Sequence, residues 1–297
     1  MNARGFDLLV LGIGVAAVST AAIMIREADA PAIVIAAYRL GLASLPLLVL
    51  AGLRRGHGLR SRRDVLAMMA LSGVFLALHF GFWVASVKQT SILTSVVLVT
   101  TTPLVVGIVG GPLLGERPGR TIWLAMGVAA LGTLLMVSED IDAGGDTLTG
   151  DVLALLGAVF AAGYIMAGRR VLGAGSDWLS YITVTYSTAA VLLLCAAVLS
   201  GKALTGFSNS TYALLVALAV VPQLVGHTAV NRSLGRLPAI VVSLAILGEP
   251  VGATILAAIF LGEEPTLTQL AGGLVVLTGV ALGLRGDVST VPVLAPD

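Results

Sequence analysis

The sequence predicts an all-α integral membrane protein, with ten transmembrane helices arranged as two inverted five-helix repeats. Hydrophobic residues make up 57% of the 297 positions and charged residues 11%, and apolar stretches recur along the entire chain. The basic residues concentrate in alternate connections between those stretches, and the second half of the sequence partly repeats the first. Because the connections are short, these observations predict a polytopic membrane protein without a soluble domain.

Ten apolar segments are long enough to cross a hydrocarbon core of about 30 Å, which requires about 20 helical residues. They cover approximately residues 6–25, 31–53, 64–86, 91–114, 121–138, 151–171, 178–200, 211–231, 238–261 and 268–284. The first segment also fits a secretory signal peptide, since Arg4 precedes it and Ala17 and Ser19 lie near its end. Its apolar stretch is long for a signal, and its removal would leave the two halves unequal.

The distribution of basic residues predicts that both termini lie in the cytoplasm. With the N-terminus inside, the cytoplasmic connections carry 13 of the 17 Lys and Arg residues, in agreement with the positive-inside rule. These are Arg4, Arg54, Arg55, Arg60, Arg62, Arg63, Arg117, Arg120, Arg169, Arg170, Arg232, Arg236 and Arg285. The outer connections carry Arg26, Lys88 and Lys202, whereas Arg39 lies within a span. No long basic surface results, so the sequence indicates no nucleic-acid partner.

The two halves of the chain are related by an internal repeat. An offset of 147 positions, from Pro103 to Pro250, also aligns Glu116 with Glu263, each within a Leu-Gly-Glu sequence. Because each repeat contains five spans, the second enters the membrane from the opposite side, which gives inverted repeats. The chain therefore divides into a first repeat, an acidic outer linker, a second repeat and a tail expected to be disordered: residues 1–138, 139–150, 151–285 and 286–297.

The paired blocks resemble the EamA branch of the drug/metabolite transporter superfamily. Each has a mid-helix proline, then Leu-Gly-Glu, then a second proline at Pro118 or Pro265, and a glycine-rich last helix. The resemblance covers approximately residues 6–285. It implies an inner-membrane carrier that exports amino acids or other small metabolites by alternating access, through facilitated diffusion or proton exchange, without a cofactor. The implied partners are a small-molecule substrate and the lipid bilayer, and the carrier would be a monomer or a homodimer.

Glu249 and Pro250 lie in the middle of an apolar segment, and this placement predicts a binding site at the membrane midplane. A carboxylate at that depth costs several kcal/mol unless it is partnered or hydrated, and the proline interrupts the backbone hydrogen bonds. With a helix rise of about 1.5 Å per residue, Arg39 falls at a similar depth. The two side chains could pair, or Arg39 could offer a two-pronged donor to a substrate carboxylate. A kinked packing helix and a structural arginine are the alternatives.

Other polar and aromatic side chains within the spans complete the candidate substrate site, with His79 and Trp83 in the outer half of their span and Tyr164 in the inner half of its own. They are Tyr38, His79, Trp83, Thr101, Thr102, Tyr164, Tyr186 and Gln223. Thr102 is the repeat partner of Glu249, and Pro103 and Pro250 are the expected helix breaks. For any one of the eight, packing is the stronger interpretation, since buried Thr, Tyr and His commonly bond neighbouring backbone. We expect Glu116 to be structural, through helix capping or pairing with Arg117 or Arg120.

The sequence favours a carrier over two other functions. A membrane enzyme acting on lipid-linked substrates would need His, Asp or Glu residues clustered at one membrane face, and the sequence contains no such cluster. A channel would line its path with like residues repeated by oligomer symmetry, whereas the two halves here place unlike residues at the midplane. With Cys195 as its single cysteine, the sequence also lacks a Cys/His metal-site spacing.

Overall fold

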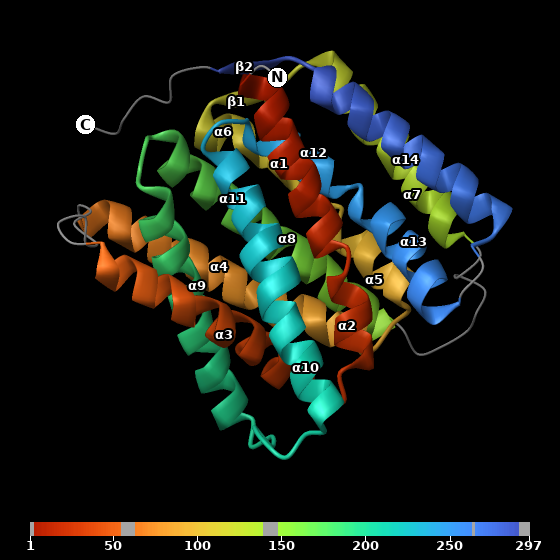
Figure 1. The fold of residues 1–297 in the computed structure, drawn as a ribbon. Helices are drawn as coiled ribbons and strands as arrows, with labels where there is room; N and C mark the ends of the chain where they lie inside the picture. Colours follow the sequence, from red (N-terminus) through yellow and green to blue (C-terminus); the bar gives the residue numbers. More distant parts are fainter. Residues whose placement is uncertain (1–2, 55–62, 139–147, 263–264, 291–297) are drawn as a thin grey trace.

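The computed structural model describes residues 3–54, 63–138, 148–262 and 265–290, and most of them are helical (Figure 1). Within these residues, nine helical stretches are long and apolar enough to cross a membrane: Arg4–Glu27, Ala32–Leu53, Arg63–Val87, Ile92–Leu114, Leu148–Gly173, Trp178–Leu199, Asn209–Leu234, Ala239–Phe260 and Leu267–Arg285. A further apolar helix, Arg120–Met136, is shorter. Each of the ten predicted segments coincides with one of these stretches to within a few residues.

Several stretches are divided into shorter elements. In chain order these are α1 (Ala3–Val18), α2 (Ala21–Glu27), α3 (Ala32–Leu53), α4 (Arg63–Val87), α5 (Ile92–Val99), α6 (Thr102–Leu114), β1 (Glu116–Pro118), α7 (Arg120–Val137), α8 (Leu148–Gly173), α9 (Trp178–Leu199), α10 (Asn209–Leu218), the π-helix η2 (Ala219–His227), α11 (Thr228–Leu234), α12 (Ala239–Ile246), α13 (Glu249–Leu261), α14 (Leu267–Arg285) and β2 (Val288–Thr290).

The internal repeat is visible in the bounds of the helices. α12 and α13 reproduce the bounds of α5 and α6 at the offset of 147 positions, for example from Thr102 to Glu249. Both α6 and α13 carry a proline in the first turn, where its missing N–H removes no helical bond. Both end at a glycine with positive φ, Gly115 at 71° and Gly262 at 69°. A residue without Cβ adopts this conformation without strain, and it terminates the helix.

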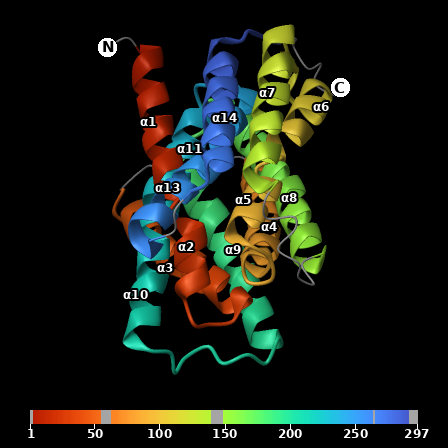
Figure 2. The same cartoon turned by 90° about the vertical axis from the view of Figure 1, so that its right-hand side faces the viewer.

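The helices α7 and α14 pack along each other at one side of the bundle (Figures 1 and 2). Their contact depends on glycine: a Cβ atom at Gly279 would lie 2.7 Å from the backbone N of Ala129. Likewise, a Cβ at Gly132 would lie 2.6 Å from the carbonyl oxygen of Gly272. Small residues thus bring the two backbones close together, as in many membrane helix pairs.

The start of the C-terminal tail is ordered, contrary to the expectation of disorder from residue 286. Val288–Thr290 form β2, which pairs antiparallel with β1, and Arg117 lies opposite Ser289. Gly119 N also donates to the carbonyl oxygen of Asp287 at 3.1 Å. These backbone hydrogen bonds supply the order that the short segment would lack by itself.

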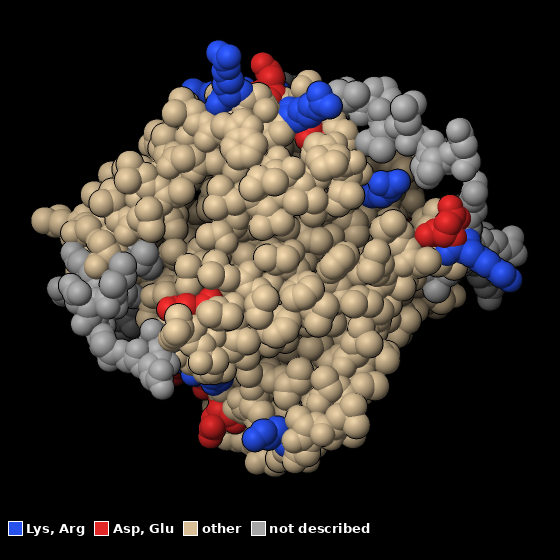
Figure 3. All heavy atoms as spheres, turned by 180° about the vertical axis from the view of Figure 1, so that it is seen from behind, with Lys and Arg blue, Asp and Glu red and all other residues tan. Residues whose placement is uncertain are grey.

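The surface of the molecule is mostly apolar. Figure 3 shows a broad face on which Lys, Arg, Asp and Glu lie mainly near the margins. Large hydrophobic side chains such as Leu45, Ile108 and Phe260 are exposed on the helices. This is the surface of a protein that lies in a bilayer. Several predicted features lie outside the described residues: Arg55, Arg60 and Arg62, the acidic positions 139–147, Glu263 and positions 291–297.

Candidate functional site

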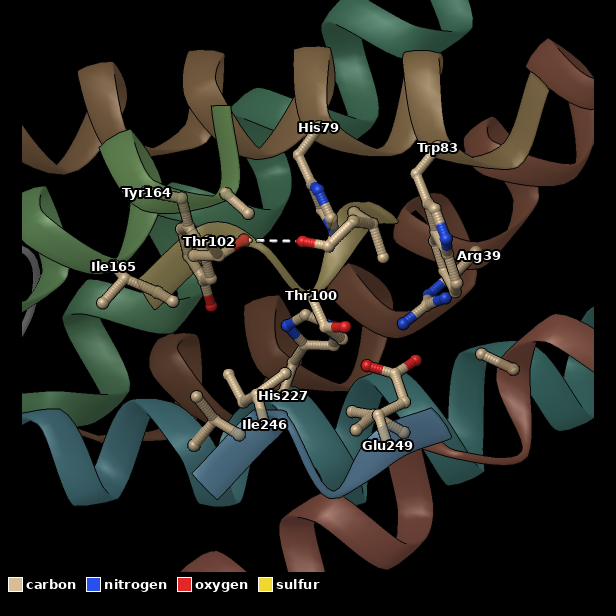
Figure 4. A pocket seen from close by; sticks show the side chains of 15 residues that line it. Arg39, His79, Trp83, Thr100, Thr102, Tyr164, Ile165, His227, Ile246 and Glu249 are labelled. Atoms are coloured by element: carbon tan, nitrogen blue, oxygen red, sulfur yellow. Dashed lines mark hydrogen bonds between the residues drawn. The ribbon is translucent and has the colours of Figure 1, made fainter. Parts of the chain in front are cut away.

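A cavity of about 50 Å³ lies at the centre of the helical bundle (Figure 4). Its lining comes from α1 to α6, α8, η2, α11, α12 and α13, and no described residue of α7 or α14 contributes to it. The polar and aromatic members of the lining are Arg39, His79, Trp83, Thr100, Thr102, Tyr164, His227 and Glu249. The volume holds a few water molecules, so the arrangement must open before a larger ligand enters.

Arg39 is fully buried on α3, and its guanidinium is held from two directions. Nε donates to Oε1 of Gln223 at 2.9 Å, and the guanidinium carbon lies 4.1 Å from the centre of the Phe80 ring and 5.9 Å from that of Trp83. Neither Nη1 nor Nη2 has a hydrogen-bond partner among the described residues. A buried guanidinium with both terminal amino groups free and its plane fixed is suited to bidentate binding of a carboxylate.

Glu249 faces Arg39 across the cavity. It is the first residue of α13 and is 7% exposed, and its carboxylate is directed toward the guanidinium (Figure 4). The helix N-terminus contributes partial positive charge that favours a carboxylate there. Among the residues that the structure describes, no ion pair joins Arg39 to Glu249. A cation and an anion therefore face each other with room for a small polar group between them.

Two histidines lie beside this pair. Nδ1 of His79 lies 2.9 Å from the carbonyl oxygen of Gly157, and because a carbonyl only accepts, Nδ1 is the donor. The His79 ring is stacked on Trp83, with 5.9 Å between centroids and 5° between planes. His227, which the sequence did not single out, ends the π-helix with its ring 6.5 Å from that of His79. Its position in a rare π-helical turn is a signal often found at functional sites.

A buried hydrogen-bond network connects a cavity-lining side chain, that of Tyr164, to neighbouring helices. Tyr164 donates its hydroxyl proton to Oδ1 of Asn231 at 2.7 Å, and Nδ2 of Asn231 donates to the hydroxyl of Tyr186 at 3.1 Å. The Tyr186 hydroxyl also lies 3.3 Å from Oγ1 of Thr228. Tyr186 therefore contacts the network and does not line the cavity. Asn231 was missed by the sequence reasoning, although a fully buried amide within an apolar span is a detectable signal.

The predicted site threonines bond mainly to backbone. The hydroxyl of Thr101 donates to Leu98 O at 2.7 Å and lies outside the cavity lining. The hydroxyl of Thr102 lines the cavity and reaches Val99 O at 2.8 Å and Ala158 O at 3.3 Å. These bonds close the break between α5 and α6, where helical carbonyls lack their usual partners.

Tyr38 and Gln223 lie outside the central cavity. The Tyr38 hydroxyl donates to Leu204 O at 3.0 Å, and its side chain lines a different cavity between α3 and α9. Gln223 lies behind Arg39 and orients it. Of the predicted set, the central cavity is thus lined by Arg39, His79, Trp83, Thr102, Tyr164 and Glu249. Tyr38 and Tyr186, which we expected to share one cavity, do not line it: Tyr38 lines the second cavity, and Tyr186 belongs to the hydrogen-bond network.

Glu116 forms a buried connection between distant parts of the chain, and its partners differ from those expected. Oε1 accepts from Nε of Arg169 at 2.6 Å, and Oε2 accepts from the backbone N of Ala239 at 2.8 Å, rather than from Arg117 or Arg120. The carboxylate therefore joins β1, α8 and the first turn of α12. Within the described residues, no group of three or more His, Cys, Asp or Glu side chains is placed to hold a metal ion.

Residues 5–138 and 148–285 each match the family model of the EamA-like transporter family. The two matched ranges correspond to the two predicted repeats.

Curated relatives match over most of their length. The uncharacterized transporter YdfC of Bacillus subtilis is 26% identical over 83% of this chain and 79% of its own. The pseudopaline exporter CntI of Pseudomonas aeruginosa is 26% identical over 87% of this chain and 89% of its own. A solved crystal structure aligns with a TM-score of 0.77 and 18% identity over 95% of this chain and 98% of its own, which is a likeness of fold.

Proposed function

Because this chain belongs to the EamA-like transporter family, we propose that it is a secondary carrier that exports amino acids or other small metabolites across the inner membrane. Export is supported by one relative, the pseudopaline exporter of Pseudomonas aeruginosa, which resembles this chain over most of its length. The transport cycle follows the alternating-access scheme of carriers with repeated halves.

The observation that carries the proposal is the pair of unpartnered Nη groups of Arg39, fixed in a central cavity opposite Glu249. A substrate carboxylate binds the two Nη groups, and a substrate ammonium binds the carboxylate of Glu249. Each group of a zwitterion then replaces water with an oppositely charged partner, which offsets the loss of hydration in a buried site. Trp83 supplies a further donor, because its indole N–H has no partner among the described residues.

The proposed topology has ten spans in two inverted repeats, with both termini in the cytoplasm. The matching bounds of α5–α6 and α12–α13 and the excess of arginine in alternate connections support it. The two interrupted helices place their breaks, at Thr101 and Gly248, close to the cavity. Discontinuous helices of this kind typically form the substrate site near the midplane in carriers built from inverted repeats.

A counterflow screen in proteoliposomes tests the proposal. Purified protein is reconstituted into proteoliposomes, and these vesicles are loaded with unlabelled amino acids, amines, sugars or nucleobases. Uptake of the same compound in labelled form is then measured. We expect exchange of zwitterionic compounds and none of neutral sugars. Exchange of sugars or amines without exchange of any carboxylate-bearing compound would contradict the role of Arg39, and ion conductance without saturable exchange would indicate a channel.

A further inference from the structure

A second cavity, separate from the central one, lies between α3 and α9. Its volume is about 510 Å³, within the range of roughly 300–1,000 Å³ usual for small-molecule sites. Among the described residues, it shares no lining residue with the central cavity, and none of its lining residues is charged. We call it the α3–α9 groove.

The α3–α9 groove opens toward the hydrocarbon of the bilayer. Its lining includes Leu45, Leu48, Val191 and Leu194, which are 58%, 48%, 60% and 52% exposed. All four lie within helices long and apolar enough to span the membrane. Lipid chains are therefore the molecules that meet these side chains.

Polar groups occur where the loop after α9 closes the groove. There the Tyr38 hydroxyl donates to the carbonyl oxygen of Leu204, and Thr205 also lines the groove. Lys202, in the same loop, is exposed. Lysine at the end of a span lies near the lipid headgroups and attracts their phosphates. Because Lys202 follows the end of α9, this end of the groove is the one nearer the headgroups, and the rest of the groove is lined by the apolar spans.

The groove lies on the opposite side of two helices from the central site. Tyr38 and Ser187 line the groove, whereas their neighbours Arg39 and Tyr186 are fully buried toward the interior. The Oγ atom of Ser187 has no hydrogen-bond partner among the described residues. An occupant of the groove would thus pack against the turns of α3 and α9 that position Arg39 and Tyr186.

We propose that the α3–α9 groove binds an acyl chain of an anionic phospholipid whose headgroup lies beside Lys202. The apolar lining and the lateral opening favour a hydrocarbon chain over a polar metabolite, which would find no charged partner there. The exposed cation at the polar end favours a phosphate. The site is additional to the proposed transport site and does not depend on which substrate that site carries.

Gly41 provides a way to fill the groove without disturbing helix packing. It lines the groove on α3, and no atom lies within 4 Å of the position that its Cβ would occupy. Gly52 on the same helix has an equally open Cβ position but does not line the groove. Gly41→Leu and its matched control Gly52→Leu both replace glycine with a stronger helix former, so both variants should fold.

Native mass spectrometry of the purified full chain, titrated with long-chain phosphatidylglycerol, tests the proposal. Gly41→Leu should weaken the tightest lipid binding by about tenfold or more, because leucine displaces several methylene groups from the groove, while Gly52→Leu should bind like wild type. Equal lipid binding by all three proteins would overturn the proposal. So would unchanged lipid binding with loss of a dimer in Gly41→Leu, which would assign the groove to a second copy. Unchanged lipid binding with loss of counterflow would assign it to the transported substrate.

Discussion

Gln223 accepts a hydrogen bond from Nε of Arg39 at 2.9 Å, and this contact directs the two free Nη groups of the arginine toward the cavity. Gln223 belongs to the π-helix, where its backbone carbonyl oxygen accepts a hydrogen bond from Oγ1 of Thr228 at 3.3 Å. Arg39 is thus held through the one nitrogen that bidentate carboxylate binding does not need. The remaining donors stay available for a ligand.

Replacement of Arg39 by lysine should weaken substrate affinity by about tenfold or more, because an ammonium retains the charge but cannot form the two parallel hydrogen bonds. The measurement is the KM for counterflow, normalised to folded protein in the proteoliposomes. Wild-type KM in Arg39→Lys would remove the guanidinium from substrate recognition.

Replacement of Asn231 by leucine should destabilise the protein by about 1–3 kcal/mol, because the buried Tyr164 and Tyr186 hydroxyls each lose a partner. Thermal unfolding in detergent measures the stability. Tyr164→Phe removes one end of the same network, so the double variant should be less destabilised than the sum of the single ones. Strict additivity would show that the two side chains do not act together.

Tryptophan at position 279 should prevent the close contact of α7 and α14. A Cβ atom there already falls 2.8 Å from the carbonyl oxygen of Ala125, so backbone must shift, at a cost of about 1–3 kcal/mol or more. The abundance of folded, monodisperse protein should fall. Gly127→Trp, on α7 with open space around its Cβ, is the control and should express normally. Wild-type abundance of Gly279→Trp with an altered substrate profile would place this helix at the cavity instead.

The fold was largely predictable from the sequence, because long apolar runs and the offset between Pro103 and Pro250 report directly on spans and repeats. The family resemblance was confirmed by the match over both halves. The π-helix Ala219–His227 was not predictable, since a change of hydrogen-bond register leaves no mark in hydrophobicity. The β2 strand is ordered because it pairs with β1, and the paired residues Pro118 and Val288 are 170 positions apart in the chain. Local sequence does not reveal a pairing over that distance.

The candidate site was predictable in depth but not in direction. Counting residues along the helices placed Arg39 and Glu249 at one level, and the structure places them face to face. Successive residues on a helix point about 100° apart, so only packing decides that Tyr38 faces away from the cavity that Arg39 lines. Asn231 is buried through contacts with two other spans, and its role depends on them.

Replacement of Glu116 by glutamine should loosen the start of α12, because one of the two acceptor oxygens becomes a donor that faces Arg169 or Ala239 N. A charge-assisted hydrogen bond contributes about 1.5–3 kcal/mol, so the fraction of molecules in which the start of α12 is locally detached should rise about tenfold or more. The measurement is the reactivity of a cysteine at the buried Ser233 toward a maleimide, with Cys195 replaced by alanine. Arg170→Gln, which removes an exposed bond to Leu113 O, is the control. Unchanged reactivity would make Glu116 a purely local cap.

Replacement of Glu249 by glutamine should abolish substrate accumulation driven by a pH gradient, while downhill exchange continues with a weaker affinity, because the substrate ammonium loses its charged partner. The reason is that glutamine keeps the size and hydrogen-bonding capacity of the side chain but carries no exchangeable charge, whereas a carboxylate in an apolar site with alternating access to water can bind and release a proton during the cycle. Glu249→Asp retains the carboxylate and serves as the control, which should keep pH-driven accumulation. Both activities are measured in proteoliposomes and normalised to folded protein. If Glu249 were only structural, both variants would yield less folded protein and the remaining molecules would transport normally in both assays. Full pH-driven accumulation by Glu249→Gln would therefore exclude this carboxylate as the proton carrier.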